Sequence, residues 1–97
     1  MTEYGSEKRK APRYNGALPV ELGSSRGVTR DYSIAGVFFY IDVQLAQGDP
    51  VNFSMIFNHL DAGRQMRVNC HGTVVRSSRE RERYGVAVQL NSHSFGI

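Results

Sequence analysis

Two groups of residues in this sequence have the types and spacing needed to bind a ligand that carries phosphate and a nucleobase. The first is Arg9 and Arg13, in a polar N-terminal segment that also contains Pro12. A guanidinium group pairs bidentately with phosphate and stacks on flat rings. On an extended segment the two groups can stand roughly 13 Å apart, enough to contact two phosphates, or one phosphate and one purine. Because arginine accounts for ten of the 12 basic residues, this spacing is expected about once by chance.

The second group is the segment Asp31-Tyr32-Ser33-Ile34-Ala35-Gly36. An Asp or Asn with Ser and Gly at these offsets is expected by chance in roughly 5% of chains of this length. As a turn, the segment would bond its Asp and Ser side chains to nearby backbone and place the glycine at positive φ. As part of a site, the carboxylate would accept from the two adjacent N–H donors of a guanine edge, and the hydroxyl would bond the base or a phosphate. The two interpretations are compatible.

Alternating apolar residues predict the elements that position these groups. Six β-strands are expected, at about residues 17–22, 27–30, 37–41, 51–57, 66–75 and 84–90, with a bulge at Gly72. Short turns connect them, and six strands of this kind indicate a small antiparallel β-barrel, because closure removes exposed edges. We therefore expect an all-β fold in which residues 1–15 form a flexible N-terminal arm and residues 16–97 form the barrel domain.

Composition sets the broad class of the protein. With 97 residues and 40% hydrophobic content, the sequence has the size of one globular domain. No apolar run approaches the roughly 18 residues of a membrane span, and the polar segment 1–13 is not a secretory signal. With a single cysteine, Cys70, no internal disulfide is possible, so we expect a cytoplasmic protein. The net charge of +3 favours an anionic partner.

Catalytic and metal-binding chemistry is poorly supported. The three histidines, His59, His71 and His93, could be combined with Cys70 as metal ligands. On a strand, however, Cys70 and His71 face opposite ways, which opposes a shared metal. Ser33 as a nucleophile would need a histidine base and an orienting acid, and nothing in the sequence places them beside it. We therefore expect neither a metal site, nor a cofactor, nor an enzyme.

Taken in their order along the chain, these features resemble the PilZ domain family. Arg9 and Arg13 match its Arg-x-x-x-Arg loop, 17 residues before the segment that matches its Asp/Asn-x-Ser-x-x-Gly motif. A later sequence pattern extends the resemblance to about residues 8–90. It consists of Gly72-x-Val74-x-Arg76, a charged hairpin, and then Tyr84-Gly85-Val86-Ala87-Val88. The resemblance implies a six-stranded antiparallel barrel that binds the bacterial second messenger cyclic di-GMP on its outer face.

The resemblance also implies roles for individual residues. Arg9 and Arg13 would contact phosphates and guanine of cyclic di-GMP. Asp31 and Ser33 would hold a guanine edge, and Gly36 would let the backbone approach closely. The arginine loop precedes the first strand and would fold over the ligand. We therefore expect a non-catalytic receptor whose arm becomes ordered on binding, and this ordering would be the signal to a downstream protein partner.

Two further residues are weaker candidates for ligand contact. Lys8 directly precedes the first arginine. In family members the residue at this position influences whether one ligand or an intercalated pair of ligands binds. A cation here is compatible with the pair, which carries more negative charge. Arg76 matches a strand arginine that some members use. By strict alternation Arg76 would share the apolar face of Val74 and Cys70, so a bulge near Gly72 or at the end of the strand must turn it outward.

Two alternatives remain. The chain could be a protein-interaction barrel of the same fold that does not bind nucleotide. It could also be a barrel that binds single-stranded nucleic acid, in which exposed aromatic residues such as Tyr14, Tyr32 and Tyr40 would stack bases. That alternative predicts strongly salt-dependent binding to oligonucleotides, and DNA is not an expected partner in the main hypothesis.

Overall fold

The computed structural model describes residues 12–59 and 64–96, which form β-strands joined by turns and bends. Among these residues, no helical segment has the length and hydrophobicity of a membrane span. The strands are β1 (Tyr14–Asn15), β2 (Pro19–Leu22), β3 (Ser25–Tyr32), β4 (Gly36–Ile41), β5 (Pro50–His59), β6 (Arg64–Glu80) and β7 (Arg83–Gly96).

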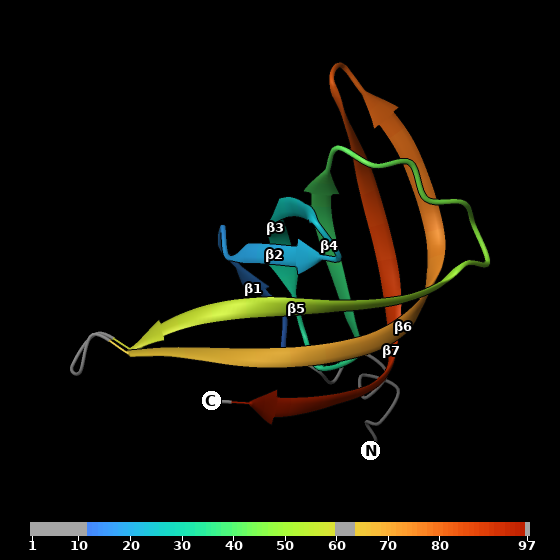
Figure 1. Ribbon diagram of the computed structural model, residues 1–97. Helices are drawn as coiled ribbons and strands as arrows, with labels where there is room; N and C mark the ends of the chain where they lie inside the picture. The colour runs from blue at the N-terminus through green and yellow to red at the C-terminus, as the bar shows by residue number, and fades with distance from the viewer. Residues whose placement is uncertain (1–11, 60–63, 97) are drawn as a thin grey trace.

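The strands form one closed antiparallel sheet (Figure 1). Its order is β3-β2-β5-β6-β7-β4, and the pairing of β4 with β3 closes the barrel. The short strand β1 pairs with β3 beyond the end of β2. The predicted all-β, six-stranded antiparallel barrel is therefore confirmed, with β1 as an additional strand. The hairpin of β5 and β6 extends to one side of the barrel, and the hairpin of β6 and β7 rises above it (Figure 1).

The inward side chains of these strands form one apolar core. Val20, Phe39 and Val86 are completely buried, and the rings of Phe39 and Phe53 lie 5.1 Å apart between centroids. The predicted alternation is confirmed on β2, β5, β6 and β7, whose inward residues include Val20, Phe53, Met55, Val68, Cys70, Val86 and Val88. Each strand therefore has an outer face free to carry polar residues.

A β-bulge at Arg30 changes which residues of β3 face outward. Thr29 pairs with the core residue Phe39, and Asp31 pairs with Phe38, the neighbour of Phe39. Arg30 therefore has no partner on β4 and is the extra residue of the bulge. Paired residues on neighbouring strands share a face. In a regular strand Asp31 would share the inward face of Thr29. The bulge therefore places the carboxylate of Asp31 on the outer face and keeps it out of the apolar core.

A second bulge has the same effect on β6. Val74 pairs with Val88, and Arg76 pairs with Ala87, so Val75 is the extra residue. Val74 is buried in the core, whereas Val75 is an exposed hydrophobic residue. The predicted outward turn of Arg76 is confirmed. A further register shift follows His71, where β7 contains the extra residue Asn91, so the irregularity predicted at Gly72 is also present.

The edge of β3 opposite β4 carries both β1 and β2, separated by a break that Thr29 bridges. The Thr29 hydroxyl donates to the Gly16 carbonyl and accepts from the Leu18 N–H, and the Thr29 N–H donates to the Leu18 carbonyl. β1 is thereby held against the last residues of β3. Arg13 directly precedes β1, so this arrangement brings it beside Asp31.

Most strand boundaries lie close to the predicted ones, but β6 and β7 extend beyond their predicted ends. β6 continues to Glu80. β7 continues through residues 91–96, a stretch in which no strand was predicted, and its residues 92–96 pair with Arg67–His71 of β6. In the same stretch, β6 pairs with β5 on its other side. The turn that joins β5 to β6 falls on residues 60–63, outside the described residues.

The bulge at Arg30 leads to a test of the fold. Deletion of Arg30 would remove the extra residue and leave Thr29 opposite Phe39 and Asp31 opposite Phe38, so the Asp31 carboxylate would stay on the outer face. We therefore expect the deletion to fold and to unfold with a free energy close to that of Arg30→Ala, which also removes the side chain but keeps the chain length. Denaturant unfolding of wild type and both variants checks this. A deletion less stable than Arg30→Ala by about 3 kcal/mol or more, the cost of an unpaired buried charge, would contradict the assignment of Arg30 as the extra residue.

Candidate functional site

The two bulges place a row of outward residues across four neighbouring strands. Asp31 of β3 pairs with Phe38 of β4, Phe38 pairs with Ala87 of β7, and Ala87 pairs with Arg76 of β6. At the usual strand spacing the row is roughly 14 Å long. It crosses an open surface hollow of about 460 Å³, which we call the outer hollow. Its lining residues are Arg13, Asn15, Arg30, Asp31, Gly36, Val37, Phe38, Val75, Arg76, Ala87 and Val88.

Two arginines converge on Asp31 at one end of this row. Arg13 Nε and Nη2 donate to Asp31 Oδ1 at 3.0 and 2.5 Å, and Arg30 Nε donates to Oδ2 at 2.7 Å. The side chain of Asp31 is 11% exposed, against 50% for Arg13 and 53% for Arg30. One carboxylate therefore anchors two half-exposed guanidinium groups, and the cluster keeps one net positive charge.

The electrostatics of Asp31 follow from these contacts. Burial raises the pKa of the Asp31 carboxyl, but the hydrogen bonds from Arg13 and Arg30 outweigh burial and leave the pKa below its ordinary value. Hydrogen bonding to Asp31 is in turn the main cause that raises the pKa of Arg30. Asp31 is thus ionised at neutral pH and keeps its capacity to accept hydrogen bonds.

Ser33 builds the turn that follows Asp31. Its Oγ accepts from the N–H groups of Ala35 and Gly36 at 3.1 and 3.2 Å, and its own N–H donates to the Gly36 carbonyl at 2.8 Å. Arg13 Nη1 also donates to Ser33 Oγ, at 3.4 Å. The hydroxyl therefore takes the place of a backbone acceptor and fixes the start of β4, in agreement with the turn interpretation.

Gly36 is required because β7 passes close to it, and not because the turn needs a positive φ there. The expectation of a positive φ is wrong, because the described glycines with positive φ are Gly23 and Gly48. A Cβ on Gly36 would instead lie 2.9 Å from the carbonyl oxygen of Val88. Gly36 thus permits close approach of β7, and the Leu90 N–H bonds the neighbouring Ala35 carbonyl at 2.9 Å.

The structure brings together most of the residues selected from the sequence. Arg13, Asp31 and Ser33 are in direct contact, while Gly36 and Arg76 line the same hollow. Lys8 and Arg9 lie outside the described residues. Sequence reasoning missed the contribution of Arg30 and Phe38. Phe38 faces outward by the regular alternation of β4, and the bulge brings Asp31 to the same face. The only signal for Arg30 was its position directly before Asp31 in an arginine-rich chain.

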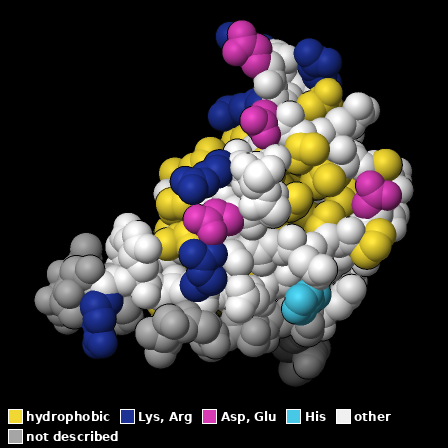
Figure 2. Space-filling model, viewed as in Figure 1, with side chains coloured by type: hydrophobic (Ala, Val, Ile, Leu, Met, Phe, Trp, Pro, Cys, Tyr) yellow, Lys and Arg dark blue, Asp and Glu magenta, His cyan; other side chains and the backbone are white. Residues whose placement is uncertain are grey.

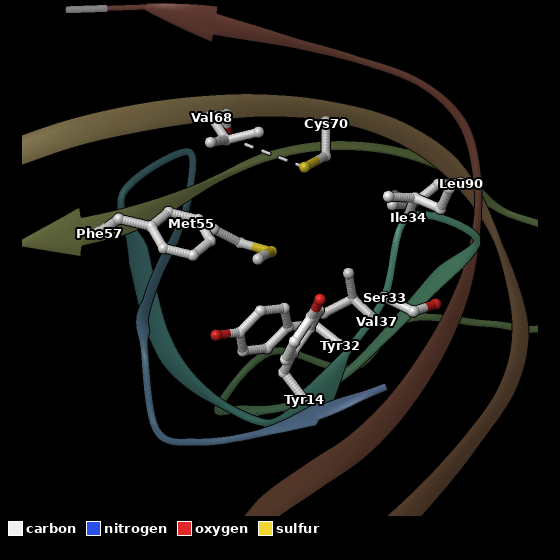
Figure 3. A pocket seen from close by; sticks show the side chains of 10 residues that line it. All are labelled: Tyr14, Tyr32, Ser33, Ile34, Val37, Met55, Phe57, Val68, Cys70 and Leu90. Atoms are coloured by element: carbon white, nitrogen blue, oxygen red, sulfur yellow. Dashed lines mark hydrogen bonds between the residues drawn. The ribbon is translucent and has the colours of Figure 1, made fainter. Parts of the chain in front are cut away.

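A second hollow, at one end of the barrel, is lined by uncharged and mostly apolar residues, and we call it the apolar hollow (Figure 3). Its volume is about 230 Å³, and its lining residues are Tyr14, Tyr32, Ser33, Ile34, Val37, Met55, Phe57, Val68, Cys70 and Leu90. None of the ten carries a charge at neutral pH. Burial raises the pKa of the Cys70 thiol to about 11, whereas its neighbour His71 is exposed. An anionic ligand therefore has its counter-charges in the outer hollow and lacks them here.

The aromatic residues do not form one stacking surface for nucleic acid. Tyr32 lies at the apolar hollow, packed edge-on against Phe57 at 5.7 Å between centroids. Tyr40 is on the outer face of the sheet, with the Arg83 guanidinium carbon 3.8 Å from the centroid of its ring. Figure 2 shows basic side chains interspersed with acidic ones on the face that it displays. This arrangement gives little support to the single-stranded nucleic-acid alternative.

Comparison with known proteins gives one family and one fold. Residues 7–95 match the sequence model of the PilZ domain. No curated protein matches the chain. Among solved structures, the chain is similar to the Bacillus subtilis inhibitor of motility MotI/DgrA, with a TM-score of 0.70 and 14% identity. The similarity covers 90% of this chain and 44% of that one, and at this identity it supports the shared fold alone.

The position of Asp31 predicts a pH dependence of stability. Because its folded pKa is depressed, its contribution is complete above the unfolded value of 3.8 and is lost as the pH falls through the lower folded value. We expect wild type to melt above Asp31→Asn at pH 6, and this difference to shrink below about pH 3.8. Thermal melts across this range test it, with Glu82→Gln at the exposed hairpin tip as control. A difference independent of pH would contradict the ion-pair account.

Proposed function

This chain belongs to the PilZ domain family, a family of cyclic di-GMP receptors, and we propose that it binds cyclic di-GMP in the outer hollow as a non-catalytic receptor. The observation that carries the proposal is the contact of Arg13 with Asp31 and Ser33. These residues come from two motifs separated by 17 intervening residues, yet a half-exposed arginine of the first contacts two largely buried polar side chains of the second. Each motif alone has an ordinary structural explanation, and their convergence favours a shared ligand.

The chemistry of the outer hollow fits a cyclic dinucleotide. Such a ligand carries two phosphodiester charges and two purines. The hollow provides Arg13 and Arg30 at one end of the row and Arg76 at the other, with the apolar residues Phe38 and Ala87 between them. Guanidinium groups suit both phosphates and the O6/N7 edge of guanine. The charge of the ligand is thus matched by cations from three different segments of the chain.

Binding would redistribute the hydrogen bonds of Asp31. In the structure its two oxygens accept three bonds from Arg13 and Arg30, while a carboxylate has about four acceptor sites. A guanine edge with two N–H donors therefore competes with one of the arginines. Arg13, which is half exposed, is the group we expect to swing onto the ligand, together with Arg9 from the preceding segment. Ser33 and Gly36 would act by holding the turn in shape.

We propose that the signal is the ordering of residues 1–13 over the bound ligand. Arg13 adjoins β1, and the ring of Tyr14 packs against Tyr32 at 5.7 Å between centroids. Movement of Arg13 would therefore be transmitted to β1 and to the rim of the apolar hollow. Lys8 would influence whether one ligand or an intercalated pair is bound. We expect the receptor to act in the bacterial cytoplasm through a downstream protein partner, with no cofactor.

Calorimetric titration with cyclic di-GMP tests the proposal. Loss of one well-placed bidentate contact costs about 1–3 kcal/mol, so Arg13→Ala should raise Kd roughly 5- to 150-fold without a large change in melting temperature. Arg26→Ala removes another exposed arginine of β3, at the end remote from Asp31, and should leave Kd unchanged. Hydrogen exchange of residues 1–13 should slow on binding. No heat of binding to wild type, or equal affinity of Arg13→Ala, would contradict the proposal.

A further inference from the structure

Arg30 has an environment that neither family motif accounts for. It is the extra residue of the β3 bulge, and its guanidinium carbon lies 3.8 Å from the centroid of the Phe38 ring. Its Nε donates to Asp31 Oδ2 at 2.7 Å. A surface arginine normally keeps a freely moving, solvated head group. The head group of Arg30 is instead held at two points, by a carboxylate and by an aromatic face.

The ring beneath Arg30 is fixed as well. Phe38 is only 7% exposed although it belongs to the outer face of β4. It packs edge-on against Tyr40 at 5.4 Å between centroids. On β7, a Cβ at Gly85 would lie 2.8 Å from Phe38 Cζ, so this glycine leaves the space that the ring occupies. Phe38 is thus a rigid support, and the guanidinium of Arg30 covers it.

The opposite side of the guanidinium is open. The side chain of Arg30 is 53% exposed, and both Arg30 and Phe38 line the outer hollow. Since Phe38 covers one side, the accessible surface is the other face of a planar cation. Purines stack on arginine planes as well as on aromatic rings. The geometry therefore offers a site for a flat base directly beside the Asp31 carboxylate.

We propose that Arg30 is a base-stacking residue of this receptor, holding a purine between its guanidinium plane and solvent while Asp31 bonds the edge of the same base. This inference rests on the proposed binding of cyclic di-GMP and adds a specificity determinant to it. Asp31 and Phe38 pre-position the guanidinium before the ligand arrives. Ordering this long side chain therefore adds little cost on binding, and the site should prefer purine cyclic dinucleotides to pyrimidine ones.

The chain contains a matched control for this geometry. Arg83 lies 3.8 Å above the centroid of Tyr40, which follows Phe38 by two residues on β4 and shares its outer face. The two cation–π pairs are thus alike in distance and neighbouring in space. Arg83, however, is not among the residues that line the outer hollow, and no bond joins it to Asp31. Stacking on Tyr40 alone should not contribute to binding of the ligand.

Titrations with cyclic di-GMP and cyclic di-UMP test the proposal. They compare the wild type with four variants: Arg30→Ala, Arg30→Lys, Arg30→Gln and Arg83→Ala. One lost base stack should raise Kd for cyclic di-GMP roughly 5- to 150-fold in Arg30→Ala. Arg30→Lys keeps the charge but lacks the plane, so it should resemble Arg30→Ala. Arg30→Gln keeps a planar group and should retain more affinity. Arg83→Ala should match wild type, which should prefer cyclic di-GMP to cyclic di-UMP.

Three results would overturn the stacking role while leaving cyclic di-GMP binding intact. They are unchanged affinity in Arg30→Ala, full rescue by lysine but not glutamine, and an equal loss in Arg83→Ala. The second would assign Arg30 to charge alone. No binding of cyclic di-GMP by the wild type would contradict the proposed function and, with it, this inference. Thermal melts of each variant separate loss of binding from loss of fold.

Discussion

At Arg30 the third strand contains one residue more than the strand opposite it, and the geometry of the outer hollow depends on this mismatch. A regular strand would bury the Asp31 carboxylate among the core residues around Phe39. The bulge reverses the alternation, so that Asp31 faces outward beside Phe38. The same device at Val75 turns Arg76 outward at the other end of the row. Bulges of this kind often re-aim side chains next to functional sites.

The ion pairs around Asp31 contribute more to arrangement than to stability. Exposed ion pairs are usually worth less than about 1 kcal/mol, and both arginines are half exposed. Their value lies in orientation, because a shared carboxylate holds two planar cations at the rim of one hollow. The core provides the stability independently, through buried residues such as Phe39 and Val86. The outer face can therefore carry charged groups without weakening the barrel.

Much of this architecture could be predicted from the sequence. The alternation on β5, with Val51, Phe53 and Met55 inward, follows from the period of a strand. The outward turn of Arg76 also followed, because strict alternation would have buried a cation beside Val74. The bulge at Arg30 was not predictable in this way, since Thr29 and Asp31 alternate without any apolar residue to mark their face. The continuation of β7 beyond Leu90 was equally hidden, because residues 92–96 pair through backbone groups that a polar sequence does not reveal.

The central claim is that the ligand lies across the row from Asp31 to Arg76 on the outer face of the barrel. The most direct measurement is an NMR titration of backbone amides with cyclic di-GMP. We predict that the largest shifts occur at Asp31, Phe38, Ala87 and Arg76 and at the Ser33–Gly36 turn, while Asn52 and Asn69 of the polar surface on β5 and β6 change little. Shifts centred on that β5–β6 surface or on the apolar hollow, with the row unaffected, would contradict the account.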